Sequence, residues 1–235
     1  MNRRIKFVKY FIDKIEKYTF DKRIAKYYKE IKNDVSCLID VGSNVGQSID
    51  IFSKSFSGCD IYSIEANPKC YNELLNNYKS KSYIHFFNIG ISDVDAKKKF
   101  YVNVLDTTST FEDLNHESEH LKLKKKVLGV SNIIDEVIDV DVLTLDTFMN
   151  ENKLHNVNFI KIDTEGHEFS CLKGLFVAPK EHLPKYIQIE LHFDDMYSNQ
   201  NADIEKLLKS NNYKVFGSVK HSFGKFEDRI YRLSS

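Results

Sequence analysis

Apolar residues in the first part of the chain recur at intervals of three and four positions. This spacing runs from Arg3 to Ile31 and is the period of an amphipathic helix. The pattern is interrupted near Thr19 and Phe20, where Asp21 is a residue type that caps helix N-termini. The sequence therefore predicts an N-terminal extension, residues 1–35, that consists of two amphipathic helices separated near Asp21.

Beyond residue 35, short β-rich apolar runs alternate with segments of helical period. The predicted strands of the main sheet are Cys37–Val41, Ile61–Ile64, Tyr83–Ile89, Asn158–Ile162, Tyr186–Leu191, Tyr213–Val219 and Arg229–Leu233, the last two as a hairpin. The predicted helices are Gln47–Phe56, Pro68–Tyr78, Asp146–Asn150, Glu168–Leu175 and Ala202–Ser210. Two further strands, Phe100–Val104 and Val140–Leu145, fall in an insertion at about residues 100–145.

This alternation of strands and helices is typical of βαβ units, which pair their strands in parallel with right-handed crossovers. The predicted fold class is therefore α/β, with a doubly wound, mostly parallel seven-stranded sheet and an antiparallel terminal hairpin. A chain of 235 residues buries one sizeable core. We therefore expect a single domain over residues 36–235, preceded by the helical extension.

Acidic and basic residues balance over the whole chain, with 34 Lys and Arg against 34 Asp and Glu. No overall field favours nucleic acid as a partner, so none is expected. The first 33 residues, however, carry a charge of roughly +7. Their basic helix faces suit an anionic membrane surface or an acidic glycan, although most such faces simply contact solvent.

The four cysteines stand far apart, at positions 37, 59, 70 and 171, and form no C-x-x-C pair. This spacing argues against a disulfide framework or a thiolate zinc site and is typical of a reducing compartment. No apolar run approaches the roughly 20 residues of a membrane-spanning helix, and no signal-peptide core is present. We expect a soluble cytoplasmic protein, at most peripheral to a membrane.

A glycine-rich crossing follows the first predicted strand. The order is strand, Asp-x-Gly-x-x-x-Gly and helix, with Gly42 able to adopt a strained turn and Gly46 at the start of the helix. Doubly wound sheets bind ligands at such a crossing. Glu65 ends the second strand about 20 residues later, where a carboxylate can accept hydrogen bonds from both hydroxyls of a ribose. The pattern predicts a ligand that contains adenosine.

The residues around the crossing favour S-adenosylmethionine (AdoMet) over a dinucleotide. The dinucleotide fingerprint needs a glycine at the position of Asn44, and the Asp40 carboxylate would repel a pyrophosphate. AdoMet instead carries an ammonium and a sulfonium, and its carboxylate suits the helix N-terminus after Gly46. An NAD(P)-dependent oxidoreductase and a non-catalytic protein of the same fold are the alternatives.

Six motifs occur in an order that resembles the FkbM-type methyltransferases over roughly residues 37–195. They are Asp40–Gly46, Glu65–Pro68, Asn88–Asp93, Leu143–Phe148, Ile160–Glu168 and Ile189–His192. The resemblance implies a Rossmann-like class I methyltransferase fold, AdoMet as cofactor, and O-methylation of a hydroxyl on a saccharide or glycosylated small molecule. The cofactor-binding residues that it implies are Asp40, Gly42, Asn44 and Gly46 at the methionine end, Glu65 at the ribose, and Ala66, Asn67, Gly90, Ile91 and Ser92 around the adenine.

A hydroxyl acceptor must lose its proton during methyl transfer, so the site needs a base or a metal ion. Asp163, Glu165 and His167 follow the strand Asn158–Ile162, and alternation along an extended chain would place them on one side. One possibility is that His167 or His192 is the general base, with Asp163 as its orienting partner. Another is a hard divalent cation bound by Asp163, Glu190 and His192.

A structural interpretation of the same segment is also open, in which Asp163 or Thr164 caps the following helix and Glu168 stabilises its first turn. Methyltransferases that act on nucleobase amines usually carry an Asn/Asp-Pro-Pro-aromatic turn after this strand. Here the turn is Asp-Thr-Glu-Gly, which makes a base amine an unexpected acceptor.

The segment His116–His120 matches the zinc pattern H-E-x-x-H, which requires both histidines on one face of a packed helix. Polar residues and the lysine run Lys122–Lys126 surround it, so a metalloprotease is not expected. We predict instead that residues 106–139 form a polar insertion over the site. The remaining histidines, His85, His155, His182 and His221, show no partner pattern and receive no role.

Overall fold

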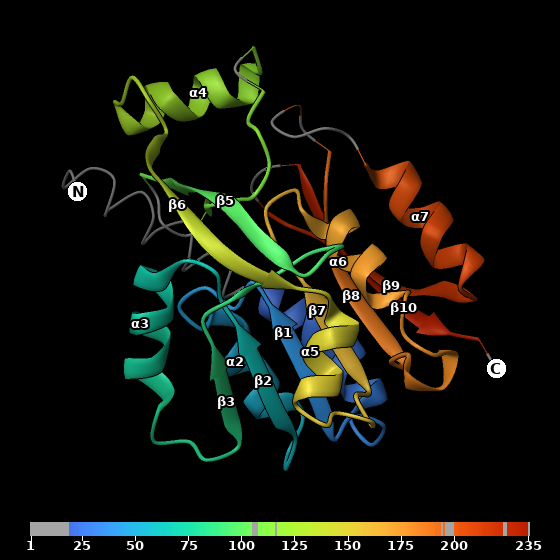
Figure 1. The fold of residues 1–235 in the computed structure, drawn as a ribbon. Helices are drawn as coiled ribbons and strands as arrows, with labels where there is room; N and C mark the ends of the chain where they lie inside the picture. The colour runs from blue at the N-terminus through green and yellow to red at the C-terminus, as the bar shows by residue number, and fades with distance from the viewer. Residues whose placement is uncertain are drawn as a thin grey trace.

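The computed structural model describes residues 19–104, 108–115, 117–193, 195, 200–222 and 225–234. Within them, seven strands form the main sheet in the order β3-β2-β1-β7-β8-β10-β9 (Figure 1). The strands are β1 Cys37–Val41, β2 Asp60–Ile64, β3 Ile84–Phe87, β7 Phe159–Ile162, β8 Tyr186–His192, β9 Tyr213–Lys220 and β10 Phe226–Leu233. The first five pair in parallel, whereas β10 runs antiparallel between β8 and β9. The predicted α/β class, doubly wound sheet and terminal hairpin are confirmed.

Helices cover both faces of this sheet. One face packs against α5 Leu145–Glu151, α6 Glu168–Leu175 and α7 Asn201–Ser210. The other packs against α2 Gln47–Ser55, α3 Pro68–Tyr78 and the N-terminal helix of residues 19–31. Asn67 caps α3 by accepting a hydrogen bond from the Lys69 amide, and proline at the first helical position suits the same start. None of the described helices has the length and apolarity needed to cross a bilayer.

The N-terminal helix belongs to the core of the domain rather than to a detached arm. Its residues Ile24, Tyr28 and Ile31 are buried, and the Tyr28 ring packs edge-on against Phe159 of β7 at 5.8 Å. Asp21 does not cap this helix, because the two residues before it are already helical. The prediction of an N-cap at Asp21 is therefore wrong. The other predicted helix lies outside the described residues.

The insertion forms a second, smaller sheet. Strands β4 Gly90–Ile91, β5 Ala96–Asn103 and β6 Ile134–Leu143 pair in the order β4-β6-β5. Helix α4 Glu119–Leu128, which the sequence analysis did not predict, stands beyond β5 and β6, away from the main sheet (Figure 1). The zinc pattern is not carried by one helix, because α4 starts at Glu119 with Ser118 as its N-cap.

Some strand boundaries differ from the predicted ones because hydrogen-bonded pairing with a neighbouring strand sets them. Strand β3 is shorter than Tyr83–Ile89 because its ladder with β2 covers only Ile84–Phe87. Strand β6 starts at Ile134 because its ladder with β5 runs from Ile134 to Val142, including exposed positions that carry no hydrophobic signal.

We expect Gly174→Ala to destabilise the fold. Gly174 lies in α6, where a Cβ atom would stand 2.1 Å from the Ser92 carbonyl oxygen. The helix must move away, which lowers the free energy of unfolding by about 1–3 kcal/mol, measured by urea denaturation. Ser170→Ala, at a half-buried position of the same helix, is the matched control and changes stability by less than about 0.5 kcal/mol. Equal stabilities of the two variants would contradict this close contact.

Candidate active site

A cavity of about 650 Å³ opens at the carboxyl ends of the parallel strands. It is lined by segments that follow β1, β2 and β7, by Glu190 of β8, and by residues of the N-terminal helix and the terminal hairpin. Its size lies within the range of small-molecule sites. The residues that the sequence pattern selects at the crossing, Gly42, Asn44 and Gly46, are all on its wall.

The crossing from β1 to α2 has a backbone that glycine alone adopts without strain. Gly42 has φ of 82°, and a Cβ atom there would stand 1.8 Å from the Asp163 carbonyl oxygen. Gly46 has φ of 99°, and its Cβ would stand 2.3 Å from the ring of Tyr78. The Tyr78 hydroxyl donates a 3.0 Å hydrogen bond to the Gly46 carbonyl. Both glycines are thus required by close packing of this loop against Asp163 and Tyr78.

Glu65 joins this crossing to the loop after β2. It is nearly fully buried, and its two carboxylate oxygens accept hydrogen bonds from the Asn44 amide at 2.8 Å and the Asn67 amide at 2.7 Å. Burial raises the pKa of Glu65 to about 7, although these two backbone donors oppose the shift. A carboxylate oxygen can accept more than one hydrogen bond, so Glu65 can still accept hydrogen bonds from a ligand in the cavity.

A row of polar side chains crosses the otherwise apolar sheet below the cavity. Strand register places Ser63 beside Asp40, Asp40 beside Lys161, and Lys161 beside Gln188. Asp40 is fully buried, and burial raises its pKa. Its Oδ2 atom accepts a 2.5 Å hydrogen bond from Ser48, whereas Oδ1 has no hydrogen-bond partner within the described part of the chain. Asp40 therefore lies behind the cavity wall rather than on its surface.

Lys161 supplies the positive charge in this row. Its ammonium lies 2.7 Å from Asp163 Oδ2. Burial alone would lower the pKa of Lys161, but the carboxylates of Asp163, Asp40 and Asp228 together raise it above its ordinary value. The same contact outweighs burial at Asp163 and lowers the pKa of that carboxyl. Lys161 is therefore a protonated counter-ion at the base of the cavity.

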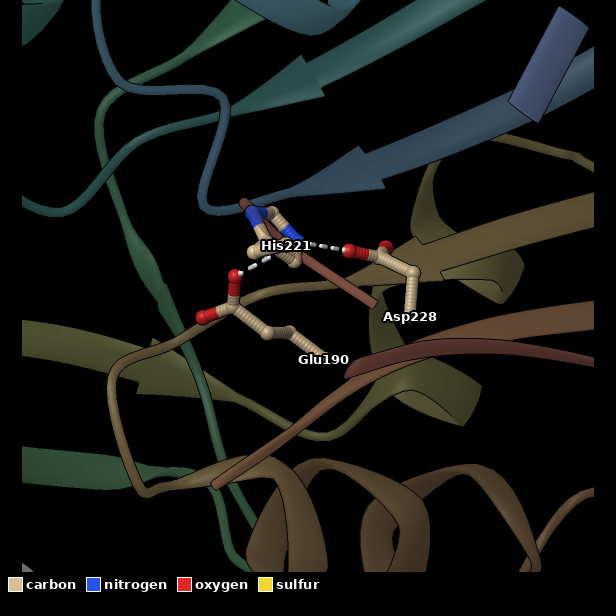
Figure 2. A group of neighbouring side chains, drawn as sticks. All are labelled: Glu190, His221 and Asp228. Atoms are coloured by element: carbon tan, nitrogen blue, oxygen red, sulfur yellow. Dashed lines mark hydrogen bonds and ion pairs between the residues drawn. The ribbon is translucent and has the colours of Figure 1, made fainter. Parts of the chain in front are cut away.

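Glu190, His221 and Asp228 form a second charged group on the cavity wall, the Glu190–His221–Asp228 cluster. Figure 2 shows the two carboxylates approaching His221, with Nε2 of the imidazole 2.6 Å from Asp228 and 3.4 Å from Glu190. The sequence pattern assigned no role to His221, and Asp228 was not among the predicted site residues. The available signal was a set of polar residues inside strands that are otherwise buried, which includes Gln188 as well as Asp228.

The predicted catalytic residues do not form one cluster. Asp163 and Glu165 line the cavity, but the strand ends at Ile162 and Glu165 has φ of 53°, so the chain is not extended there. The expectation that positions 163, 165 and 167 share one side is therefore wrong. His167 is buried elsewhere, with Nε2 3.0 Å from Ser92 Oγ and Nδ1 2.6 Å from Glu112 Oε1.

The other predicted residues divide between the cavity and the structure behind it. His192 is almost buried, with Nε2 3.3 Å from Glu190, and is not on the cavity wall. Glu168 stabilises the turn before α6, because its Oε1 accepts from the Thr164 amide at 2.8 Å and the Gly166 amide at 3.2 Å. The predicted cofactor residues that line the cavity are Gly42, Asn44, Gly46, Glu65, Ala66, Gly90 and Ile91, whereas Asp40, Asn67 and Ser92 lie behind it.

The sheet order, with its antiparallel strand beside the edge, and the acidic cavity at the β1 crossing together define the class I methyltransferase fold. Residues 40–215 match the family model described as the methyltransferase FkbM domain. The chain therefore belongs to the FkbM methyltransferase family.

Known proteins with similar sequences or structures include other methyltransferases. The chain is 25% identical over 148 residues to a protein named Methyltransferase 1 from Beauveria bassiana (strain ARSEF 2860), an alignment that covers 60% of this chain and 59% of that relative. In structure it is similar to magnesium protoporphyrin IX methyltransferase (ChlM) from Synechocystis PCC 6803, solved with bound SAM, with a TM-score of 0.52, 12% identity, and 100% and 85% of the two chains covered. A SAM dependent methyltransferase from Aquifex aeolicus gives a TM-score of 0.50, 15% identity, and 99% and 98% coverage. These two structural similarities concern the fold.

We expect Lys161→Met to destabilise the protein strongly near neutral pH. The change leaves buried carboxylates without their counter-ion, and breaking a buried ion pair in this way costs about 3–5 kcal/mol. The loss shrinks at pH 5, because protonation of the neighbouring carboxyls removes the uncompensated charge. Denaturant unfolding at pH 7.5 and pH 5 measures both values.

The matched control is Lys97→Met, which removes an exposed ion pair with Asp141 at 3.4 Å. Such a pair contributes less than about 1 kcal/mol. If Lys161→Met were as mild as this control at pH 7.5, Lys161 would not be the counter-ion of the buried carboxylates.

Proposed function

We propose that this protein binds AdoMet in the cavity and transfers its methyl group to a hydroxyl of a saccharide or glycosylated small molecule. The observation that carries the proposal is the position of Glu65 opposite the Gly42 crossing, on the wall of one cavity. A carboxylate at this point suits the two hydroxyls of a ribose. Membership of the FkbM methyltransferase family supports the same cofactor.

The charges around the cavity favour AdoMet over a pyrophosphate-containing dinucleotide. The acidic residues on or just behind its wall are Asp21, Asp40, Asp50, Glu65, Glu73, Asp163, Glu165, Glu190 and Asp228, whereas Lys161 is paired with Asp163. This surplus of negative charge attracts a sulfonium and an ammonium and opposes two phosphates. The unpartnered Asp40 Oδ1 adds to the field near the methionine end. We therefore rank an NAD(P)-dependent oxidoreductase below the methyltransferase.

The reaction requires little covalent chemistry from the protein. When bound, AdoMet supplies a methyl group that is already activated by its sulfonium. The bond from this carbon to sulfur breaks as the acceptor oxygen bonds to it, the hydroxyl proton is lost, and the products are a methyl ether and S-adenosylhomocysteine. Asp163 and Glu165 face the cavity after β7, where Asp163 can orient the acceptor. Burial raises the pKa of Glu165, which suits a proton acceptor near neutral pH.

The remaining expectations about the cell are also part of the proposal. All four cysteines are free thiols, which suits a reducing cytoplasm. A contact with an anionic membrane surface or acidic glycan would involve the basic N-terminal segment, most of which lies outside the described residues. Lysines of α4 provide a second basic surface within the insertion.

Binding of S-adenosylhomocysteine should weaken as the pH falls below 7. The ribose hydroxyls donate to the ionised Glu65 carboxylate, so binding favours the ionised form and lowers its pKa from the value of about 7 in the free protein. Affinity then decreases up to about tenfold per pH unit between pH 7 and the lower pKa of the complex. Isothermal titration calorimetry from pH 8 to pH 5 measures this slope.

Glu65→Gln should bind more weakly at pH 8 and lose the slope. Glu73→Gln is the matched control, because Glu73 is an exposed carboxylate on the same cavity rim and should keep the wild-type profile. A wild-type affinity that is constant from pH 8 to pH 5 would contradict the role of Glu65.

A methyl-transfer screen tests the reaction itself. The full chain is incubated with AdoMet carrying a labelled methyl group and with pools of saccharides and glycosylated small molecules, with and without a chelator. We expect label in a product that resists mild alkali, as a methyl ether does and a methyl ester does not. Glu65→Ala should lose transfer, because it removes the ribose acceptor.

Three results would count against the proposal. They are label recovered as an amine or ester, no change in melting temperature with millimolar S-adenosylhomocysteine, and stabilisation by NAD(P) instead. Binding of S-adenosylhomocysteine without any transfer would favour a non-catalytic protein of the same fold.

A further inference from the structure

Three side chains that can ligate a metal ion converge where β8 meets the terminal hairpin. Each member of the Glu190–His221–Asp228 cluster offers one ligand atom, and these atoms lie within 4.8 Å of one another (Figure 2). Both carboxylates approach the same ring nitrogen, with Asp228 Oδ2 2.6 Å and Glu190 Oε1 3.4 Å from His221 Nε2. The three ligand atoms therefore lie close enough together to share one ion.

The two carboxylates are neighbours by strand register. Asp228 pairs with Glu190 in the antiparallel ladder of β10 and β8, and the side chains are only 3% and 12% exposed. Like charges directly opposite each other on a sheet destabilise it, more so when they are buried. The buried ammonium of Lys161 acts on Asp228 from a distance, but its close contact is with Asp163, at 2.7 Å. A cation bound between Glu190 and Asp228 would attract both carboxylates directly.

Neighbouring residues hold the donors in place. Gln188 donates a 2.5 Å hydrogen bond to Asp228 Oδ1, and the Tyr28 hydroxyl donates a 2.6 Å hydrogen bond to Gln188 Oε1. This chain directs the other oxygen of Asp228 toward His221. The ring of Phe20 stacks on His221 with centroids 4.3 Å apart. Hydrogen-bonded and packed ligands of this kind are typical of metal sites, where outer residues orient the inner ones.

We propose that the Glu190–His221–Asp228 cluster is a divalent cation site with two carboxylate oxygens and one imidazole nitrogen as ligands. Carboxylate oxygens favour Mg²⁺ and Mn²⁺, and imidazole is a common ligand of divalent metals. The set differs from the one expected from sequence, because His221 and Asp228 replace His192 and Asp163.

All three residues line the same cavity as Glu65, so an ion bound to them would be open to the cavity. There the ion would bind the acceptor hydroxyl and lower its pKa, so that Glu165 accepts the proton while the oxygen bonds to the methyl carbon and the carbon–sulfur bond of AdoMet breaks. This chemical role rests on the proposed function, whereas cation binding does not depend on it.

Titration of the full chain with MnCl₂ in the absence of AdoMet tests the site, with free Mn²⁺ followed by electron paramagnetic resonance. We expect one tightly bound ion per wild-type chain. Glu190→Gln and Asp228→Asn keep the side-chain size but remove a charged ligand, and each should weaken binding at least tenfold. Asp141→Asn removes an exposed carboxylate, 72% accessible, and should bind Mn²⁺ as the wild type does. Thermal unfolding of each variant confirms that it is folded.

Two results would overturn the site: no Mn²⁺ uptake by the wild-type chain at millimolar concentration, or wild-type affinity in both amide variants. Stabilisation by S-adenosylhomocysteine, measured separately, distinguishes this failure from that of the proposed function. Mn²⁺ uptake without any response to S-adenosylhomocysteine supports the cation site and overturns methyl transfer. The opposite outcome overturns the cation site alone.

Discussion

The arrangement of the cavity depends on the ion pairing between the buried ammonium of Lys161 and the carboxylates around it. It lies in β7, between β1 and β8, and contacts Asp163 at 2.7 Å while Asp40 and Asp228 also raise its pKa. An isolated charge at this depth would cost several kcal/mol. Shared among several carboxylates, the same charge allows acidic side chains to remain on three strands of an apolar sheet. The negative field at the carboxyl edge is therefore built into the core.

The loops above this row are fixed to one another before any ligand arrives. Gly42 packs on the Asp163 carbonyl so closely that no side chain fits between them, and Glu65 binds the backbone of the neighbouring loop. The insertion is tied to the same edge, because Thr110 donates a 2.7 Å hydrogen bond to the Glu165 carbonyl and His167 joins Ser92. Preorganised polar groups of this kind favour catalysis, since they need not reorganise during the reaction.

Elements from the two ends of the chain complete the site. The N-terminal helix supplies Tyr28 and Phe20, and the terminal hairpin supplies His221 and Asp228. Because β10 inserts between β8 and β9, Asp228 comes to lie opposite Glu190. The cavity wall around the Glu190–His221–Asp228 cluster thus combines residues from near both ends of the described chain, whereas the wall around Glu65 comes from a compact stretch after β1 and β2.

The sequence by itself determined the features that depend on local pattern. The bounds of β1, α3 and α6 agree with those predicted from their apolar period, helped at α3 by the Asn67 cap. The crossing at Gly42 with Glu65 predicted the cavity edge, because parallel strands bring their carboxyl ends together. Only the tertiary structure decided the rest. A left-handed residue at Glu165 turned His167 away from Asp163, and long-range antiparallel pairing brought Asp228 and His221 to Glu190. Neither residue spacing nor residue type predicts such contacts. They arise from the register between strands and from the positive charge of Lys161, which stabilises acidic side chains inside the core.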